Sequence, residues 1–249
     1  MFILCTNDDG YLAPGLGVLA EAARALGNVH VVAPDREQSA QSHALTMHFP
    51  LRARQVREGV HHVDGTPTDC VAVALGALLE RKPDLVLSGI NHGPNMGEDV
   101  LYSGTVAAAM EATILGIPAV AVSFAGRDAA HMQSYRPLLE ALLPQLVTRG
   151  EFPAETLLNV NLPPRDASAV RGVQVTRLAR RVYADSLTRA HDPNGREYFW
   201  IGGGNVEWSA PEGTDFHAVN DGYVSVTPLH LDLTNHALIQ DVAAWNLAV

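Results

Sequence analysis

Short runs of apolar residues recur along the chain and predict the buried strands of a sheet. They are rich in Val, Ile and Leu and lack the polar alternation of a half-exposed strand. That composition is typical of parallel strands covered by helices on both faces. The runs are Phe2–Cys5, Val29–Ala33, Leu85–Leu87, Val120–Ser123 and Leu157–Val160.

Helical patterns lie between most of these runs. The four expected helices span residues 15–26, 67–80, 104–115 and about 134–148. Pro14 stands just ahead of the first helix and Gly116 ends the third, both in positions that suit those residues. Pro137 and Pro144 leave the limits of the fourth helix open. Alternating strands and helices predict a doubly wound, Rossmann-like αβα fold with three layers and a mostly parallel sheet.

The pattern changes after about residue 175. The segment HDPNGREYFWIGGGNVEW carries turn signals and clustered aromatic residues without a helical period. Its DPNG turn ahead of REYFWI predicts a β-hairpin or an extended arm. A surface excursion folded back on its own domain and an arm that packs on another subunit both fit this pattern. The stretch GYVSVTPLHLDLT, residues 222–234, then predicts a strand that returns to the main body.

The composition indicates one large folded domain. The 249 residues suffice to bury a sizeable core, and 47% of them are hydrophobic against 18% charged. A formal net charge of −10 argues against broad binding to nucleic acid or to anionic membranes. No apolar stretch reaches membrane-spanning length, and the start of the chain lacks the pattern of a signal peptide. Because Cys5 and Cys70 lie in apolar surroundings, we expect a reduced, cytoplasmic protein.

Three polar loops follow the first three predicted strands, at the edge where open α/β sheets bind ligands. The first loop, TNDDG, places Asp8 beside Asp9. An Asp-Gly pair often makes a plain turn. Two adjacent carboxylates at this edge also suit a divalent cation, because Mg²⁺ or Mn²⁺ takes oxygen ligands and removes the repulsion between the acids. The histidines and cysteines show no spacing typical of zinc.

The second and third loops add neutral oxygen donors. In APDREQSAQSHALT, Ser39 could complete a cation shell, although an isolated serine is commonly a surface or capping residue. The third loop, SGINHGPNMGEDVLYSGT, places Asn91 and Asn95 among glycines that let a ligand approach the backbone. An ordinary glycine-rich loop is the alternative, but its length favours a functional one.

The end of the third loop opens a helix with Ser103, Gly104 and Thr105. Free backbone N–H groups at a helix start form an anion site, and the hydroxyls add donors. A plain N-cap is the alternative for an isolated Ser-Gly-Thr. The proximity of a predicted cation loop favours a phosphate site. The Gly-Lys-Ser/Thr ending of a Walker P-loop is missing.

Other polar residues near these loops are expected to serve structure. His43 and His92 border the site, but a histidine beside a ligand loop more commonly faces solvent than binds metal. Asp69 is expected to cap a helix and Cys70 to lie in the core. Asp99 is typical of a solvated turn acid, and support of the phosphate loop is the alternative.

Five sequence blocks run in order along nearly the whole chain, from residue 3 to about residue 230. They are NDDGYLAPGL, VVAPDREQSA, GTPTDCV, PDLVLSGINHGPNMGEDVLYSGTVAAAMEA and GYVSVTPL. Together they resemble the stationary-phase survival protein SurE family, whose members are metal-dependent nucleotidases. The long fourth block is by far the most specific.

The resemblance implies a particular set of site residues. One divalent cation per subunit, Mg²⁺ or Mn²⁺, would be held by Asp8, Asp9, Ser39 and Asn91. The phosphate would be bound by Asn95, Ser103, Gly104 and Thr105. Asp8 and Asp9 would be the catalytic acids, and Asp8 is the better candidate for orienting or deprotonating the attacking water. The identity of the general base stays open.

The resemblance also implies an assembly and a reaction. A C-terminal β-hairpin arm, about residues 180–222 of a single domain spanning residues 1–249, would be exchanged between the subunits of a dimer or tetramer. The reaction would be hydrolysis of nucleoside 5′-monophosphates to nucleoside and phosphate, extended in some members to 3′-monophosphates and polyphosphate. The expected partners are therefore a nucleoside monophosphate and further copies of the chain, with no nucleic acid and no membrane.

Three other functions fit parts of the pattern. A phosphotransferase of the haloacid dehalogenase type also has an aspartate nucleophile after its first strand, but it spaces its two acids by one residue, whereas Asp8 and Asp9 are adjacent. A non-catalytic nucleotide-binding or regulatory module would be favoured if Asp8→Asn lost no activity, or if the wild type had no metal-dependent activity. A purely oligomeric scaffold is suggested only by the arm.

Overall fold

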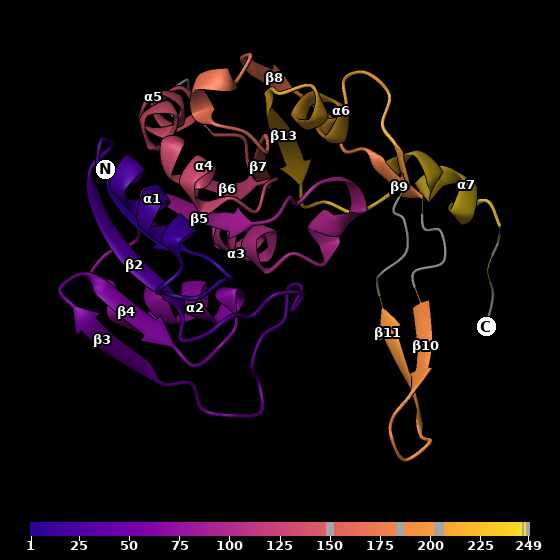
Figure 1. The fold of residues 1–249 in the computed structure, drawn as a ribbon, viewed down its shortest axis with the longest axis horizontal. Coiled ribbons are helices and arrows are strands. Elements are labelled where there is room, and N and C mark those ends of the chain that lie inside the picture. The colour runs from indigo at the N-terminus through magenta and orange to yellow at the C-terminus, as the bar shows by residue number, and fades with distance from the viewer. Residues whose placement is uncertain (148–151, 183–186, 202–206, 246, 248–249) are drawn as a thin grey trace.

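One nine-stranded sheet organises the molecule (Figure 1). The structure is a computed structural model, and it describes residues 1–147, 152–182, 187–201, 207–245 and 247. The strand order is β3-β4-β2-β1-β5-β6-β7-β13-β8. The strands span β1 Phe2–Thr6, β2 Asn28–Pro34, β3 Ala53–Arg57, β4 Val60–Val63, β5 Leu85–His92, β6 Ala119–Phe124, β7 Thr156–Leu162, β8 Val173–Val175 and β13 Val224–His230. The six strands from β4 to β7 run parallel, whereas β3 and β13 run antiparallel to β4 and β7.

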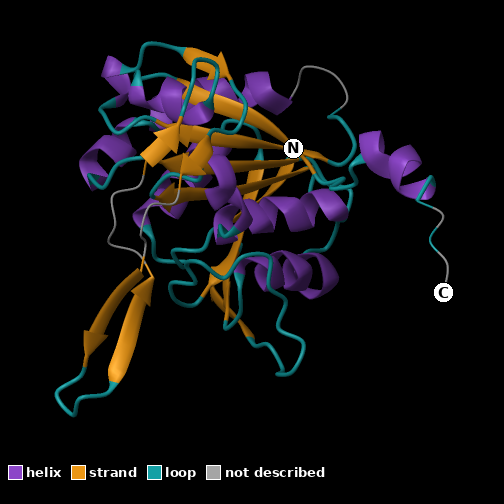
Figure 2. Cartoon of the chain, turned by 90° about the vertical axis from the view of Figure 1, so that its right-hand side faces the viewer, coloured by secondary structure: helices purple, strands orange, loops and turns teal. Residues whose placement is uncertain are grey.

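Helices cover both faces of the sheet and confirm the predicted three-layer fold (Figures 1 and 2). One layer holds α1 Pro14–Ala23, α4 Ala129–Ser134 and α5 Arg136–Val147, and the other holds α2 Pro67–Val73 and α3 Gly104–Ile114. Successive side chains of β1 alternate between the two cores, because Ile3 and Cys5 face the first layer and Leu4 faces the second. All three are fully buried, as is Cys70, so both cysteines lie in the core as expected.

Strand β5 is longer than predicted and includes part of the expected third loop. Ser88–His92 continue the strand beyond Leu87. The pairing with β6 is irregular between Ser88 and Asn91, and then resumes with Asn91 opposite Ser123. Gly89 lies at this irregularity with φ +134°, a conformation that glycine adopts readily. The polar sequence hid this extension, because it lacks the apolar pattern of the first half of the strand.

Two predicted helices differ in their limits from the expected ones. The helix expected at 67–80 is α-helical only to Val73 and continues as a π-helix over Ala74–Leu78. The helix expected at about 134–148 is divided between α4 and α5, and residue 148 lies outside the described residues. Pro137 explains the division, since proline has no backbone N–H to donate within a continuous helix but fits the first turn of a new one.

The chain leaves the sheet after β8 and returns through β13. Strands β9 (Arg180–Val182) and β12 (Glu207–Ser209) pair at the base of an arm. Beyond them the hairpin of β10 (Leu187–His191) and β11 (Glu197–Ile201) projects from the main body, which confirms the predicted hairpin (Figure 1). Helix α6 (Asp215–Asn220) packs against β13, whereas α7 (Ile239–Ala243) lies away from the sheet (Figures 1 and 2). Among the described residues, no helix has both the length and the apolar character needed to cross a bilayer.

Candidate active site at the carboxyl edge of the sheet

The acidic pair lies directly after β1. The side chain of Asp8 is almost completely buried, with 3% of the residue exposed. Its Oδ1 accepts a hydrogen bond from the Thr105 hydroxyl at the start of α3. The pKa of Asp8 is raised to about 6 overall: burial is the main cause, the neighbouring charge of Asp9 adds to the increase, and the Thr105 hydrogen bond opposes it. The buried acid is therefore held by a helix start that comes from nearly a hundred residues along the chain.

Asp9 is also partly buried and turns toward the end of β5. Its Oδ2 accepts a hydrogen bond of 3.0 Å from the backbone N–H of His92. Burial raises the pKa of Asp9, and the hydrogen bond from His92 opposes that change. Within the described residues, no ion pair joins Asp8 or Asp9 to a basic side chain. Two adjacent carboxylates thus lie partly or fully out of water, and the described part of the chain supplies no ion pair to either of them.

The start of α3 packs against Asp8 more closely than a side chain would allow. A Cβ on Gly104 would lie 2.9 Å from Asp8 Cβ and 3.1 Å from Pro67 Cγ. Ser103 is the N-cap of α3, and its hydroxyl accepts a hydrogen bond of 3.1 Å from the backbone N–H of Val106. Ser103 therefore caps α3, as the N-cap alternative expected. The backbone N–H groups of the first turn, which have no partner within the helix, start beside the acid.

The second loop lies over this pair. The backbone N–H of Gln38 donates to the carbonyl oxygen of Asp8 at 2.8 Å. The hydroxyl of Ser39 donates to Glu37 Oε1 at 2.8 Å, so the serine oxygen keeps its lone pairs for another partner. The ring of His43 pairs with Glu111 of α3 at 2.9 Å and does not join the acids. The loop thus brings one hydroxyl to the site.

Asn91 and Asn95 are held in different ways. Asn91 Nδ2 donates to the carbonyl oxygen of Gly93 at 2.9 Å, which leaves Oδ1 as the free end of the amide. Asn95 is 6% exposed, and its Nδ2 donates to Ser123 Oγ at 2.7 Å. The backbone N–H of Asn95 donates to Asn161 Oδ1 at 2.9 Å, which fixes the residue against β7.

Sequence reasoning missed the residues that hold Asn95. Asn159 and Asn161 of β7 are fully buried, and both donate through Nδ2 to the carbonyl oxygen of Asn95, at 2.8 and 2.9 Å. The signal was present, because two asparagines interrupt an otherwise apolar strand, LLNVNL. Buried amides need hydrogen-bond partners, so their presence in a core strand indicates a polar loop above it.

Most of the predicted site residues share one cavity of 810 Å³. Those that line it are Asp8, Ser39, Asn91, Asn95 and Ser103. Asp9 lines an adjoining cavity of 240 Å³, and His92 contributes to both. Gly104 and Thr105 lie behind Asp8 rather than on the cavity wall. The structure therefore groups all eight predicted residues around Asp8, five of them facing one space.

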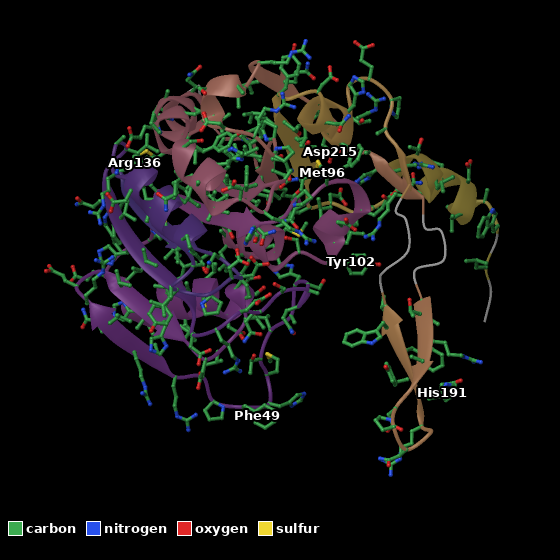
Figure 3. All side chains as sticks on the ribbon, viewed as in Figure 1. Phe49, Met96, Tyr102, Arg136, His191 and Asp215 are labelled. Atoms are coloured by element: carbon green, nitrogen blue, oxygen red, sulfur yellow. The ribbon has the colours of Figure 1, made fainter. Side chains whose placement is uncertain are left out.

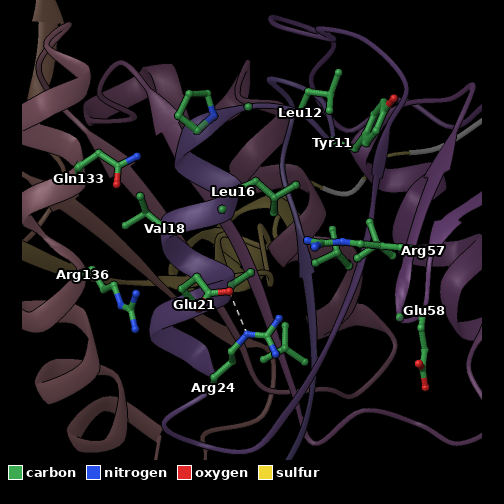
Figure 4. Close-up of a pocket in the computed structure, with 18 residues that line it drawn as sticks. Tyr11, Leu12, Leu16, Val18, Glu21, Arg24, Arg57, Glu58, Gln133 and Arg136 are labelled. Atoms are coloured by element: carbon green, nitrogen blue, oxygen red, sulfur yellow. Dashed lines mark hydrogen bonds and ion pairs between the residues drawn. The ribbon is translucent and has the colours of Figure 1, made fainter.

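Figure 4 shows a second cavity, of 540 Å³, along α1. Arg57 and Arg136 lie on its walls, and Arg24 pairs there with Glu21 at 3.0 Å. None of the predicted site residues is among the described residues that line it. It shares Ala13 and Pro14 with the cavity that Asp9 lines and extends along α1, whereas Asp8 lines the 810 Å³ cavity.

The donor set near Asp8 fits a hard divalent cation. Within the described residues, His, Cys, Asp and Glu side chains do not gather in groups of three or more suited to a metal ion. The available ligands at the edge are instead two carboxylates, a hydroxyl and an amide oxygen. Oxygen ligands of this kind are what Mg²⁺ and Mn²⁺ prefer. A cation would also balance the charges of Asp8 and Asp9, which form no ion pair with the basic side chains that the structure describes.

The fold and the site define a class of protein: a doubly wound α/β protein with an acidic pair and a helix start beside a cavity at the carboxyl edge of its sheet. The family model described as Survival protein SurE matches residues 3–185, and the chain belongs to that family. The resemblance seen in the sequence is thereby confirmed.

Proteins similar to this chain cover almost its whole length. One from Gemmatimonas aurantiaca, named 5′-nucleotidase SurE, is 60% identical over 248 residues, which are 98% of each chain. A protein of the same name from Syntrophotalea carbinolica is 50% identical and covers 99% of this chain and 98% of its own. The crystal structure of the SurE protein from Aquifex aeolicus matches with a TM-score of 0.87 at 43% identity, over 98% of this chain and 99% of that one.

Proposed function

We propose that this chain is a metal-dependent phosphomonoesterase that hydrolyses nucleoside 5′-monophosphates to nucleoside and phosphate. The observation that carries this proposal is the contact between Asp8 and the start of α3, where Thr105 donates to the acid and Gly104 lies against it. This contact supports the proposal because it joins the acid proposed to bind the cation to the helix start proposed to bind phosphate. The relatives named 5′-nucleotidase SurE support the same activity.

In this proposal the acidic edge binds the metal. Asp8, Asp9, Ser39 and Asn91 hold one Mg²⁺ or Mn²⁺. When bound, the cation supplies positive charge to the phosphoryl oxygens and to the attacking water. Asp8 also orients that water and is the proposed acceptor of its proton, since it is the acid that lines the 810 Å³ cavity.

The phosphate binds at the other side of Asp8. Asn95 and Ser103 face the cavity, and the N–H groups of Gly104 and Thr105 open the helix. N–H groups at a helix start favour an anion, and they favour the transition state more strongly as charge builds on the phosphoryl oxygens. The buried hydrogen bonds of Asn95 to Asn161 and Ser123 keep it in place for this role.

A phosphate-release assay tests the proposal. The substrates are nucleoside 5′- and 3′-monophosphates and polyphosphate, each with Mg²⁺, Mn²⁺ or a chelator. We expect activity on 5′-monophosphates that the chelator abolishes, and we propose that the same site releases phosphate more slowly from the other two substrates. The variant Asp9→Asn is expected to lose most of its activity.

A matched control makes the result specific. Asp84 precedes β5 at the opposite edge of the sheet, where it accepts a hydrogen bond of 2.6 Å from the backbone N–H of Phe2. Asp84→Asn removes a charge of the same sign far from the site and should leave kcat unchanged. Activity that survives the chelator, or full activity in Asp9→Asn, would contradict the proposal.

We also propose that the chain works as a homo-oligomer, a dimer or tetramer, in which the arm of about residues 180–222 is exchanged between subunits. The support lies in the arm itself, because Phe199, Trp200 and Ile201 are 47%, 66% and 88% exposed in the single chain. Apolar side chains gathered on a projecting hairpin favour contact with another protein surface. The cytoplasmic location stays a prediction.

A further inference from the structure

The base of the arm, strands β9 and β12, is hydrogen-bonded to the segment that joins Asn95 to Ser103, the two residues proposed to bind phosphate. This segment is the 3₁₀ helix η2, Gly97–Leu101, which lies between Asn95 and Ser103. The backbone N–H of Arg181 in β9 donates to Glu98 Oε2 at 2.7 Å. The guanidinium of the same arginine forms a charge-assisted hydrogen bond with Asp99. The arm therefore contributes a side chain to the site region.

A buried carboxylate adds a second fastening. Asp215 of α6 is fully buried and accepts hydrogen bonds from the backbone N–H groups of Gly97, at 2.9 Å, and Ala179, at 2.8 Å. Figure 3 shows Asp215 beside Met96, the residue that precedes η2. One acid thus joins η2 to the chain just before β9. This contact fixes where Arg181 enters the site.

The pair of Asp99 and Arg181 lines the 810 Å³ cavity that Asp8 also lines. Its side chains are only 28% and 22% exposed, respectively. Nearby parts of the cavity wall are less polar, since Pro94, Tyr102 and Ile201 also face this space. Asp99 is therefore not the solvated turn acid that the sequence favoured. The cavity has a phosphate end at Asp8 and a mixed wall beyond it.

The chemistry of the pair suits a neutral, hydroxyl-bearing group better than a phosphate. A carboxylate repels a phosphate dianion, and the net charge of an Asp–Arg pair is zero, so the pair adds no net attraction for it. A carboxylate does accept hydrogen bonds from sugar hydroxyls, as acids do in dinucleotide-binding folds. An apolar wall next to it suits the flat face of a base.

We propose that Asp99 accepts hydrogen bonds from the ribose hydroxyls of the substrate and that Arg181 is the positioning residue that holds Asp99 for this contact. The inference rests on the proposed nucleotidase function and names the part of the site that reads the nucleoside. It also gives the arm a direct part in substrate recognition, because β9 carries Arg181.

Steady-state kinetics with three phosphomonoesters test this subsite. Adenosine 5′-monophosphate carries both hydroxyls, its 2′,3′-dideoxy analogue carries neither, and p-nitrophenyl phosphate fills only the phosphate end. In the wild type, kcat/KM should fall about tenfold or more when the hydroxyls are removed, because the largely covered carboxylate of Asp99 then loses its hydrogen bonds to the ribose. Asp99→Ala should lose about as much on the ribonucleotide, mainly through KM, and should no longer distinguish it from the dideoxy analogue.

Two arginine variants separate positioning from general disruption. Arg181→Ala should behave as Asp99→Ala does, and Arg181→Lys should recover part of the loss because it keeps a cation beside the acid. Arg180 is exposed and does not line the cavity, so Arg180→Ala should match the wild type on every substrate. Arg180→Ala should also keep the wild-type kcat/KM on p-nitrophenyl phosphate. Asp99→Ala and Arg181→Ala should lose much less on p-nitrophenyl phosphate than on the ribonucleotide, and the activity that remains on it reports a folded site.

The results that would contradict the ribose assignment differ from those that would contradict the proposed function. An equal loss on p-nitrophenyl phosphate and on the ribonucleotide would overturn the ribose assignment, and so would a wild type that treats the dideoxy analogue as well as the ribonucleotide. A wild type without any nucleotidase activity would overturn the proposed function instead. In that case calorimetric titration of the same two nucleotides into wild type and Asp99→Ala, with Mg²⁺ present, still decides whether the hydroxyls are read.

Discussion

Gly104 shows how the absence of a side chain shapes the site. It allows the start of α3 to approach Asp8 so closely that no Cβ would fit, since a Cβ on Gly104 would lie only 2.9 Å from Asp8 Cβ. The backbone at Gly104 is ordinary helix, so steric room and not an unusual φ requires glycine here. The pattern Ser-Gly-Thr therefore serves the acid as much as the helix cap.

The variant Gly104→Ala tests this packing. The added methyl group must push Asp8 or Pro67 aside, which should cost about 1–3 kcal/mol in the free energy of unfolding. Displacement of the acid should lower kcat at least about tenfold. Urea unfolding and phosphate release from adenosine 5′-monophosphate measure the two effects.

Gly17 is the matched control. It lies in α1, and a Cβ there would meet nothing within 4 Å. Gly17→Ala should leave kcat unchanged and stabilise the protein by up to about 1 kcal/mol, since alanine suits a helix better than glycine. Equal kinetics in the two variants would show that Gly104 has no steric part in placing Asp8.

Local sequence predicted which residues gather at the edge but not how they are held. Asp8, Asn91 and Ser103 each follow or close an apolar run, so the rule that ligands bind at the carboxyl ends of strands places them together. The supports of Asn95 come from Asn159 and Asn161, more than sixty residues away. Such contacts depend on strand order, which the local pattern does not contain.

At the scale of elements, the start of α2 anchors the second loop, APDREQSAQSHALT, through hydrogen bonds. Thr66 and Asp69 form a capping box at the start of α2, which confirms the expected cap. Asp69 is 1% exposed and also accepts hydrogen bonds from the backbone N–H and the hydroxyl of Thr46, at 2.9 and 2.6 Å. The same acid therefore starts a helix and anchors the loop that carries Ser39.

We expect Asp69→Ala to damage both stability and metal binding. Loss of the cap costs about 1 kcal/mol, and the unpaired donors of Thr46 and Thr66 add about 1–2 kcal/mol. A loosened loop should place Ser39 poorly and raise the Mg²⁺ concentration needed for half-maximal activity. Urea unfolding and a metal titration of phosphate release measure these changes.

An exposed cap provides the comparison for Asp69. Asp128 is the N-cap of α4 and accepts from the backbone N–H groups of Ala130 and His131. Asp128→Ala should cost about 1 kcal/mol without any change in metal dependence. If both variants have the same metal dependence, Asp69 acts only as a cap.

Helices with a strong apolar period were predictable from the sequence, whereas exposed strands at the edge of the sheet were not. Helices α1 and α3 match their predicted spans closely. The edge hairpin of β3 and β4 was missed, because every residue of β3 is exposed and the sequence ARQVR has no buried face to reveal it. Its pairing depends on β2, which gives β4 a parallel neighbour.

At the scale of the whole molecule, two parts extend from the main body. The hairpin of β10 and β11 projects on one side, and α7 lies apart from the sheet (Figures 1 and 2). Both carry exposed apolar side chains, since Trp200 of β11 is 66% exposed and Ile239 of α7 is 48% exposed. Two residues of this arm also line the proposed substrate cavity: Arg181 in β9 and Ile201, the last residue of β11. Contacts between subunits would therefore act close to substrate binding.

The variant Trp200→Glu tests the proposed assembly. A buried tryptophan at an interface commonly contributes 2 kcal/mol or more, so a charged residue in its place should weaken association about thirtyfold or more. Sedimentation velocity over a range of concentrations should show an oligomer for the wild type and dissociation of the variant. Ile114 is 59% exposed at the end of α3 on the main body, and Ile114→Glu should sediment as the wild type does. A wild type that is monomeric at every concentration, or two variants that dissociate equally, would show that the hairpin does not hold the subunits together.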